Sequence, residues 1–570
     1  MSSLDWLVLV ASLVFIVIYG IWRGRGSKDL EGFLLADRQM RWHTIALSIM
    51  ATQASAITFL SAPGQGYVDG MRFVQFYLGL PIAMVVLSAV AIPLYRKFKV
   101  FTAYEFLEDR FDLKTRSLAA SLFLVQRGLA TGLTIYAPSI ILSVLLGWNI
   151  YLTNLIIGLL VISYTAWGGT KSVNHTHFMQ MLIIFGGMSM AFVLILRALP
   201  SEMSFLDAVF VAGEMGRLNA MDFSFDLNSR YTLWSGLIGG FFLQLSYFGT
   251  DQSQVGRYLT GRSATESRMA LLFNGIVKIP MQFSILFLGA MVFVLYQFIL
   301  PPIFFNPVEV DKVRTSSYAA EFEQLEERHR EVFAEKQDRI RGLLEAKHAG
   351  DVIATETAGR ALVESQHRFE EVRQEAIGVI QASDPDTQSS DTNYIFLSFV
   401  INFLPAGVVG LILAAIVAAS MSSTAAELNA LAATTVVDFH KRFWGRNWGP
   451  KHDVLISKIS TVFWGFFAIG FAEYASRLGS LIEAVNILGS LVYGTILGIF
   501  MVAFLLRGVG GTAVFVAAFV AEVAVVACFL LTDISFLWYN VVGCLMVMLV
   551  ALALKPFFPS QKSNQATAAV

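Results

Sequence analysis

Thirteen apolar stretches, each long enough to cross a lipid bilayer as a helix, run through this chain of 570 residues. A helix rises 1.5 Å per residue, so about 20 apolar residues span a hydrocarbon core of roughly 30 Å. Because lipid offers no partner to unpaired backbone groups, the chain is predicted to be an all-α polytopic membrane protein. Its thirteen transmembrane helices are expected at residues 5–22, 43–62, 72–95, 116–146, 149–167, 176–199, 231–252, 267–300, 399–437, 454–475, 479–505, 510–531 and 534–554.

The composition excludes several functional classes. With 56% hydrophobic and 15% charged residues, the chain is too apolar for a soluble protein. Its formal charge of -1 provides no electrostatic basis for binding nucleic acid. The sequence contains no metal-ligand cluster and no phosphate-binding glycine loop. We therefore expect no enzymatic activity, no cofactor and no nucleic-acid partner.

Basic residues next to the apolar stretches predict the orientation in the membrane. Arg23, Arg25 and Lys28 follow the first stretch at once, and loops rich in lysine and arginine stay in the cytoplasm. The N-terminus is therefore expected outside and, after an odd number of crossings, the C-terminus in the cytoplasm. This topology fits a multi-pass protein of the cell membrane.

The stretch from Ala415 to Asp438, AIVAASMSSTAAELNALAATTVVD, is unusually polar for a membrane span. Ser422 and Ser423 stand there among small apolar residues, and hydroxyl and carbonyl oxygens are suitable ligands for a hard cation such as Na⁺. The alternative is that the small residues let helices pack closely while the hydroxyls bond back to their own helix. The residues alone leave both interpretations open.

Two other stretches combine polar side chains with glycine at membrane depth. They are IALSIMATQASAITFLSAPGQGYVDG at residues 45–70 and LWSGLIGGFFLQLSYFGTDQ at residues 233–252. Such helices are often interrupted near the midplane, where freed carbonyls face an ion or a solute; an ordinary polar seam is the alternative. Because the two stand five helices apart, we predict a five-plus-five inverted repeat, helices two to six and seven to eleven, with one leading and two trailing helices.

A highly charged segment interrupts the apolar pattern. Apolar residues there recur at spacings of three, four or seven, and Ala349-Gly350-Asp351 offers a turn. This pattern predicts an antiparallel helical hairpin outside the cell, with arms of about 45 Å. It either binds a partner, whose identity is unknown, or forms a solvated lid without one.

These features divide the chain into six parts. They are a leading helix and cytoplasmic loop (1–42), the first repeat with an outer loop (43–230), the start of the second repeat (231–307), the charged extracytoplasmic hairpin (308–394), the rest of the second repeat (395–507), and two trailing helices with a short cytoplasmic tail (508–570).

Arg127 and Lys278 place basic groups inside apolar stretches, where a charge costs several kcal/mol. Each is a candidate to bind a carboxylate or hydroxyl of a solute, and Arg127 is also a candidate anion or gating residue. The alternatives are that they extend towards the membrane surface or form structural ion pairs with Glu427 or Glu483.

Four stretches of the sequence resemble the sodium:solute symporters, a family of sodium-coupled carriers of sugars, proline, sialic acid, monocarboxylates, iodide and vitamins. They are SIMATQASAITFLSAPGQGY (48–67), YTAWGGTKSV (164–173), SYFGTDQSQVGRYLTGRS (246–263) and SMSSTAAELNALAATTVVDF (420–439). The resemblance covers about residues 1–300 and 395–555 but not the charged hairpin. It implies the same five-plus-five fold.

The resemblance also implies a sodium site made of three backbone carbonyls and two hydroxyls. The matching positions are the carbonyls of Ala51, Ala54 and Ala419 and the hydroxyls of Ser422 and Ser423. A second sodium site found in some members would fall on Ala425, Ala426 and His177. These residues do not fit it, so one sodium per transport cycle is expected.

A solute pocket between the two interrupted helices is implied as well. The matching positions are Thr58, Phe76, Tyr77, Gln244, Tyr247, Lys278 and Asn486. Thr58 and Tyr77 stand where sugar carriers have an amide and an acid, whereas residues 251–258 and 428–434 are closer to the iodide and monocarboxylate branch. A small organic anion is therefore favoured over a sugar.

The expected function is sodium-coupled import of a small organic solute by alternating access. The expected partners are Na⁺, the solute and the lipid bilayer. Two alternatives are a proton-coupled transporter, which replacement of external Na⁺ at fixed pH would identify, and a solute-sensing membrane receptor, which would show no flux.

Overall fold

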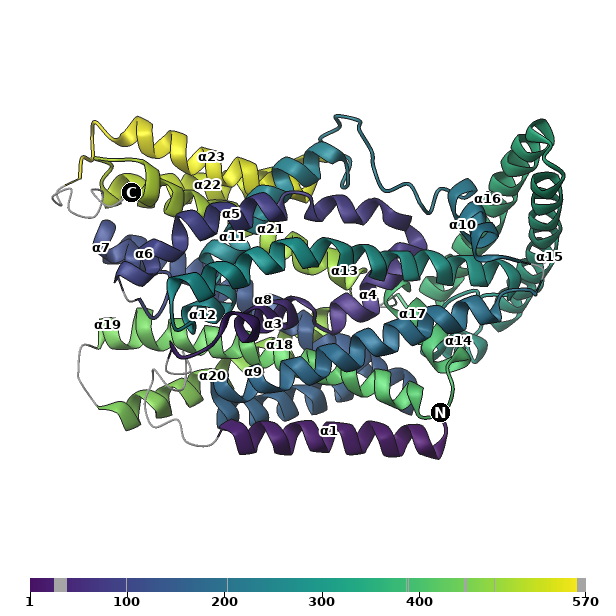
Figure 1. The fold of residues 1–570 in the computed structure, drawn as a ribbon, viewed down its shortest axis with the longest axis horizontal. Helices are drawn as coiled ribbons and strands as arrows, with labels where there is room; N and C mark the ends of the chain where they lie inside the picture. The colour runs from purple at the N-terminus through teal and green to yellow at the C-terminus, as the bar shows by residue number, and fades with distance from the viewer. Residues whose placement is uncertain are drawn as a thin grey trace.

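Long helices run side by side through the molecule, with α1 (Ser3–Gly24) along one side and α22 (Gly511–Leu531) and α23 (Phe536–Leu554) along the opposite side (Figure 1). The computed structural model describes residues 1–24, 38–98, 100–201, 203–385, 387, 389–444, 449–475 and 477–560. Within these ranges two isolated β-bridges are the only strand-like pairing, so the predicted all-α class is confirmed.

The first half of the chain forms α1, α3 (Trp42–Gln53), α4 (Ala56–Val68), the 3-10 helix η2 (Gly70–Tyr77), α5 (Leu80–Ala89), α6 (Ala91–Phe98), α7 (Glu105–Arg110), α8 (Leu113–Leu146), α9 (Ile150–Ala198), α10 (Phe205–Glu214), the π-helix η3 (Ser235–Gly239), α11 (Gly240–Thr250), α12 (Gln252–Leu259) and α13 (Ala264–Phe298). The second half forms α14 (Pro307–Arg314), α15 (Ala319–Ala349), α16 (Val352–Ser383), α17 (Thr392–Phe403), α18 (Val408–Thr434), the π-helix η4 (Thr435–His440), α19 (Lys441–Phe443), α20 (Pro450–Ala475), α21 (Leu481–Leu505), α22 and α23.

Each of the thirteen predicted spans falls largely on helix. Eight helical segments of the described chain are long and apolar enough to cross a membrane, or nine if α3 and α4 together count as one span. Shorter apolar helical stretches occur at Ser3–Phe15, Ile150–Ser163, Ile183–Ala198 and Thr392–Phe403. The membrane-spanning helical architecture is thus confirmed, and the count of thirteen crossings stays a prediction.

Two predicted spans differ from the observed helices. The span at 43–62 is two helices, α3 and α4, bent by 59° at a break after Gln53, and Pro63 lies inside α4. The span at 399–437 combines the end of α17 with α18, because Pro405 disfavours helical geometry just before it and Gly407 takes a positive φ of 86°. Predicted spans 149–167 and 176–199 both fall in α9.

A second interruption separates α11 from α12. Asp251 between them is extended, with φ -76° and ψ 119°, and its side chain accepts a hydrogen bond from the Ser253 backbone at 2.8 Å. The first break lies inside the predicted span 43–62, whereas the break at Asp251 lies at the end of the predicted span 231–252 rather than near its middle. Each break leaves helix-end carbonyls and N–H groups for other partners.

The backbones of α4 and α13 meet at glycines. A Cβ atom on Gly289 would lie 2.0 Å from the Pro63 carbonyl oxygen, and one on Gly66 would lie 2.3 Å from that of Leu286. No side chain fits between these backbones. We refer to this contact, Pro63–Gly66 against Leu286–Gly289, as the glycine seam.

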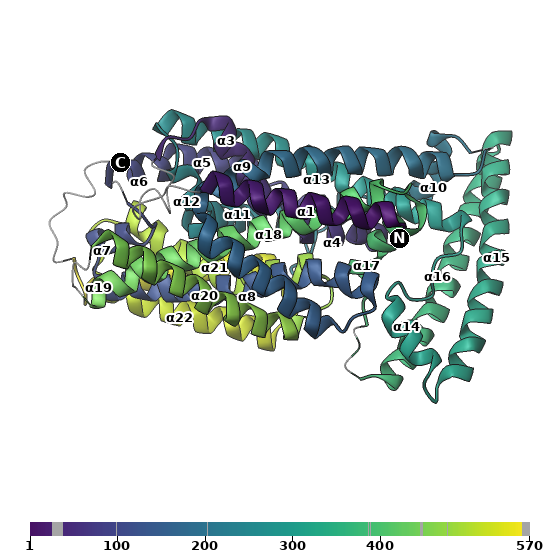
Figure 2. The same ribbon diagram turned by 90° about the horizontal axis from the view of Figure 1, so that it is seen from below.

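The charged segment forms an antiparallel pair, α15 and α16, that crosses one end of the bundle (Figure 2). The turn between the arms contains Gly350, whose φ of 71° favours glycine. One arm contacts two elements of the bundle: Gln337 donates to the Phe298 carbonyl at 2.9 Å, and Lys347 pairs with Asp207 at 2.7 Å. The hairpin is therefore fastened to the ends of α13 and α10.

Two basic side chains are buried between the hairpin arms. Lys336 is 1% exposed, and its Nζ lies 3.7 Å from the centroid of the Phe369 ring and donates to Gln366 at 3.1 Å. The His329 ring lies 4.5 Å from the ring of the same phenylalanine, centroid to centroid, at an interplanar angle of 34°. Burial lowers the pKa of Lys336 to about 7 and that of His329 to about 4.

Replacing Lys336 with methionine is expected to stabilise the hairpin, most of all at low pH. The unfolded lysine keeps its proton up to about pH 10.5, whereas the folded one loses it near pH 7, so hairpin stability rises with pH across that interval. The substitution removes this penalty, about 4–5 kcal/mol at pH 6, and its benefit vanishes towards pH 10. Hydrogen exchange of the α15 and α16 amides measures the difference at each pH. Arg360→Met, at an 83% exposed side chain, is the control, and a pH-independent effect of Lys336→Met would contradict the prediction.

Candidate functional site

A cavity of about 100 Å³ lies among the interrupted helices and their neighbours. Its wall contains all seven side chains that the sequence placed in a solute pocket, namely Thr58, Phe76, Tyr77, Gln244, Tyr247, Lys278 and Asn486. They come from α4, η2, α11, α13 and α21. Pockets for drug-sized ligands usually have about 300–1,000 Å³, so this cavity suits a small solute.

Lys278 supplies a cation to the cavity wall. Its side chain is 1% exposed, and its Nζ lies 5.6 Å from the centroid of the Tyr77 ring. Among the described residues, no carboxylate forms an ion pair with it. A buried ammonium without a direct counter-ion is costly, and an anion bound in the cavity would offset that cost.

Arg127 also lines the cavity, but two carboxylates hold its guanidinium. Its Nε donates to Asp251 at 3.1 Å, and its Nη1 donates to Glu427 at 3.1 Å. Tyr493 donates to the same Asp251 oxygen at 2.8 Å. The ion pair between Arg127 and Glu427 is one of the interpretations that the sequence left open. The candidate anion-binding role does not agree with this geometry, because the solute would compete with two fixed carboxylates.

Glu483 does not pair with either buried base. It accepts hydrogen bonds from Arg230 at 2.7 Å and from the Tyr231 hydroxyl at 2.9 Å. The sequence alternative that placed Glu483 beside Arg127 or Lys278 is therefore wrong.

Glu427 continues the polar contacts from Arg127 into α18 and α8. Its second oxygen lies 3.0 Å from the Thr134 hydroxyl, which lies 3.0 Å from the hydroxyl of Thr424. Ser420 donates to the Thr134 carbonyl. These contacts fix α18 against α8 beside the cavity.

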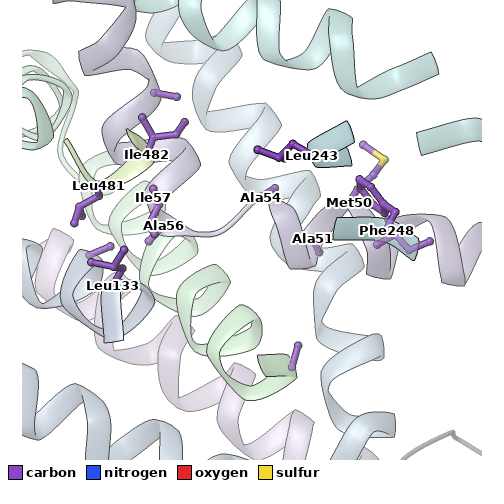
Figure 3. Close-up of a cluster of buried hydrophobic side chains, with 14 of the residues drawn as sticks. Met50, Ala51, Ala54, Ala56, Ile57, Leu133, Leu243, Phe248, Leu481 and Ile482 are labelled. Carbon is purple, nitrogen blue, oxygen red and sulfur yellow. The ribbon is translucent and has the colours of Figure 1, made fainter. Parts of the chain in front are cut away.

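The five predicted sodium ligands lie on α18 and at the α3 break. Ala51 and Ala54 stand at the end of α3, and Figure 3 shows the unwound link from Ala54 to Ala56 at the start of α4. Ser423 donates to the Ala51 carbonyl at 3.1 Å, so these two ligands are in contact. Ala419 shares the Ser423 face of α18 because it stands four residues earlier, whereas Ser422 precedes Ser423 by one residue and points about 100° away around the helix.

Sequence reasoning missed two residues that shape the site. Asp251 had a detectable signal, because an acid at the end of an interrupted helix is placed to cap the next one. Tyr493 had none, since a tyrosine in an apolar span is usually a packing residue. The side chain of His177, used to argue against a second sodium site, lies outside the described residues.

Residues 33–320 match the sequence model of the sodium:solute symporter family, which is more than half of the chain. The chain belongs to this family. Two relatives in it are the human sodium/iodide cotransporter, 30% identical over 295 residues, and sodium-coupled monocarboxylate transporter 1 of Xenopus laevis, 25% identical over 514 residues. These alignments cover 51% and 88% of this chain, and 45% and 68% of the relatives.

The family assignment agrees with a solved structure. A Na⁺-coupled sialic acid symporter, in a substrate-bound outward-open state, superposes with a TM-score of 0.74 at 21% identity. The match covers 98% of this chain and 100% of that one. This protein and the sialic acid symporter therefore share a fold. The sequence resemblance to sodium:solute symporters is therefore confirmed.

Proposed function

We propose that this protein is a sodium-coupled symporter that imports a small organic anion, with a monocarboxylate favoured over a sugar. The observation that carries the anion assignment is Lys278, a buried ammonium on the cavity wall without a direct carboxylate partner. The cavity of about 100 Å³ favours a solute of a few heavy atoms. The names of the iodide and monocarboxylate relatives are consistent with anionic cargo.

The charges around the cavity support the transport of one Na⁺ with one monoanion. Lys278, Arg127 and Glu427 line the cavity, and Asp251 pairs with Arg127. These two cations and two anions sum to zero. Since an uncompensated buried charge is costly, an occupant pair of Na⁺ and a monoanion preserves this balance.

The proposed sodium site lies where α18 meets the α3 break. Ala51, Ala54 and Ala419 would supply carbonyl oxygens, and Ser422 and Ser423 hydroxyl oxygens, the ligand type that a hard cation prefers. Ser423 and Ala51 already lie 3.1 Å apart, so Na⁺ would replace one hydrogen bond by two ligand contacts. Because Thr58 follows the α3 break by a few residues and lines the cavity, ion binding at the break would order part of the solute site.

Transport by this mechanism needs no covalent chemistry. Na⁺ moving inward would drive uptake, with about 2.3 kcal/mol per charge for each 100 mV of membrane potential. We place the N-terminus and the hairpin outside the cell and the C-terminus in the cytoplasm, on the basis of the basic residues that follow α1.

Ser423→Ala is expected to abolish the effect of Na⁺ on solute binding. The purified protein is tested against sugars, monocarboxylates, sialic acid, amino acids and vitamins, each with Na⁺ and with choline at fixed pH. A monocarboxylate should bind at least tenfold more tightly with Na⁺ in the unsubstituted protein and equally in both salts in the variant. Ser284→Ala, at an exposed hydroxyl on α13, is the control. Equal binding in both salts by the unsubstituted protein would favour proton coupling or a solute sensor.

A further inference from the structure

One face of α13 carries three polar side chains at intervals of four residues. Asn274, Lys278 and Gln282 are each at most 1% exposed, and side chains four residues apart share one face of a helix. Lys278 lines the cavity. Asn274 joins the cavity wall through Gln53, whose side-chain nitrogen donates to the Asn274 oxygen at 3.2 Å. The polar face thus begins at the cavity on one side of Lys278.

Gln282, one turn beyond Lys278 towards the hairpin, has a buried and unpaired side-chain amide. Neither its side-chain nitrogen nor its oxygen has a partner in the part of the chain that the structure describes. A buried polar atom without a partner costs about 1–3 kcal/mol, so an amide with two such atoms is expensive to keep for packing alone. An apolar side chain of similar size would fill this position at lower cost.

Gln282 lies along α13 between Lys278 and the glycine seam. One turn further along α13 begins the glycine seam, where Leu286 and Gly289 touch α4. Gln282 therefore lies between this backbone contact and the Lys278 ammonium. α4, which packs on the same face of α13 at Leu286 and Gly289, also carries Thr58, and Thr58 lines the cavity.

We propose that Gln282 is a specificity-determining residue that contacts the solute on its way between the glycine seam and Lys278. When α4 separates from α13, the Gln282 amide donates a hydrogen bond to a solute carboxylate that Lys278 attracts. A carboxylate has two oxygens, so one can accept from the ammonium and the other from the amide, whereas a halide offers a single acceptor atom. This inference rests on the proposed anion transport and adds a residue that does not line the cavity.

The test compares binding and stability of three variants of the full-length protein, with radiolabelled lactate as the probe. Gln282→Leu is expected to weaken Na⁺-dependent lactate binding about tenfold while leaving the melting temperature equal or higher, since the unpaired amide is gone. Gln282→Glu is expected to weaken it further, because the new carboxylate lies one turn from Lys278 and competes with the solute. Gln297→Leu is the matched control. Gln297 is also a buried amide on α13, but its nitrogen donates to Phe293 at 3.0 Å and it lies about 22 Å further along the helix.

The outcomes distinguish a failure of the inference about Gln282 from a failure of the proposed anion transport. If the unsubstituted protein binds lactate more tightly with Na⁺ but Gln282→Leu binds it equally well, the inference about Gln282 is wrong and the proposed function stands. A Gln282→Leu protein that loses stability together with binding would assign Gln282 a packing role and overturn the inference. If the unsubstituted protein binds no carboxylate of the panel, the proposed function itself fails.

Discussion

An Arg127→Leu protein is expected to be less stable by about 3–5 kcal/mol, the largest loss for any single substitution considered. The change leaves Asp251 and Glu427 buried without the guanidinium that both contact, and removing one partner of a buried ion pair typically costs this much. Thermal unfolding of the purified protein in detergent measures the loss. A protein of marginal stability would also reach the membrane at much lower abundance.

The effect of leaving Asp251 and Glu427 unpaired can be separated from the effect of lost packing around residue 127. Adding Asp251→Asn and Glu427→Gln to Arg127→Leu removes both uncompensated charges, so the triple variant should regain most of the melting temperature. Arg230→Leu provides the control, because Arg230 pairs with Glu483 at 2.7 Å but its side chain is 59% exposed. If Arg127→Leu unfolds at the same temperature as Arg230→Leu, the buried network does not stabilise the fold.

Lys278→Met is expected to weaken binding of a monocarboxylate by about 10- to 100-fold without destabilising the protein. Hydrogen bonds to charged groups contribute about 1.5–3 kcal/mol, which corresponds to this range of affinity. Methionine has a similar length, and the substitution removes a buried charge that has no direct partner among the described residues. Stability should therefore rise while binding falls.

Equilibrium binding of lactate in the presence of Na⁺, together with the melting temperature, tests this prediction. Gln297→Leu is again a suitable control on the same helix, far from the cavity. Unchanged lactate binding by Lys278→Met would place the solute carboxylate elsewhere and remove the main support for an anionic solute. A loss of stability would instead show that a carboxylate compensates the charge of Lys278 in the folded protein.

The helices themselves could be predicted because the signal is local. A run of about 20 apolar residues constrains the backbone to a helix whatever the rest of the chain does, and all thirteen runs fall largely on helix. The ends of the helices were less predictable. Leu404–Gly407 reads as part of an apolar run, yet Pro405 and Gly407 end one helix and start another there.

The pocket residues could be predicted from the family pattern. The ion-pair partners of the buried basic residues could not be predicted from the sequence. The seven pocket residues lie around one cavity, although they come from five separate elements. In contrast, Arg127 and Lys278 look alike in sequence, as single basic residues in apolar spans. Only tertiary contacts separate them: Arg127 meets two carboxylates from distant helices, and Lys278 meets a tyrosine ring.

The hairpin spans two elements that stand on different sides of the predicted repeat boundary. Lys347 holds α10, which follows the first repeat, and Gln337 holds the end of α13 in the second. Any rearrangement that changes the distance between α10 and α13 has to break one of these bonds or carry the whole hairpin with it. The opposite end of α15 is held as well, because Phe322 is buried in one cluster with Ile303 and Phe304 and Arg314 pairs with Glu326 at 2.6 Å. A molecule bound to the exposed surface of the hairpin would therefore slow any movement of the bundle that separates α10 from α13.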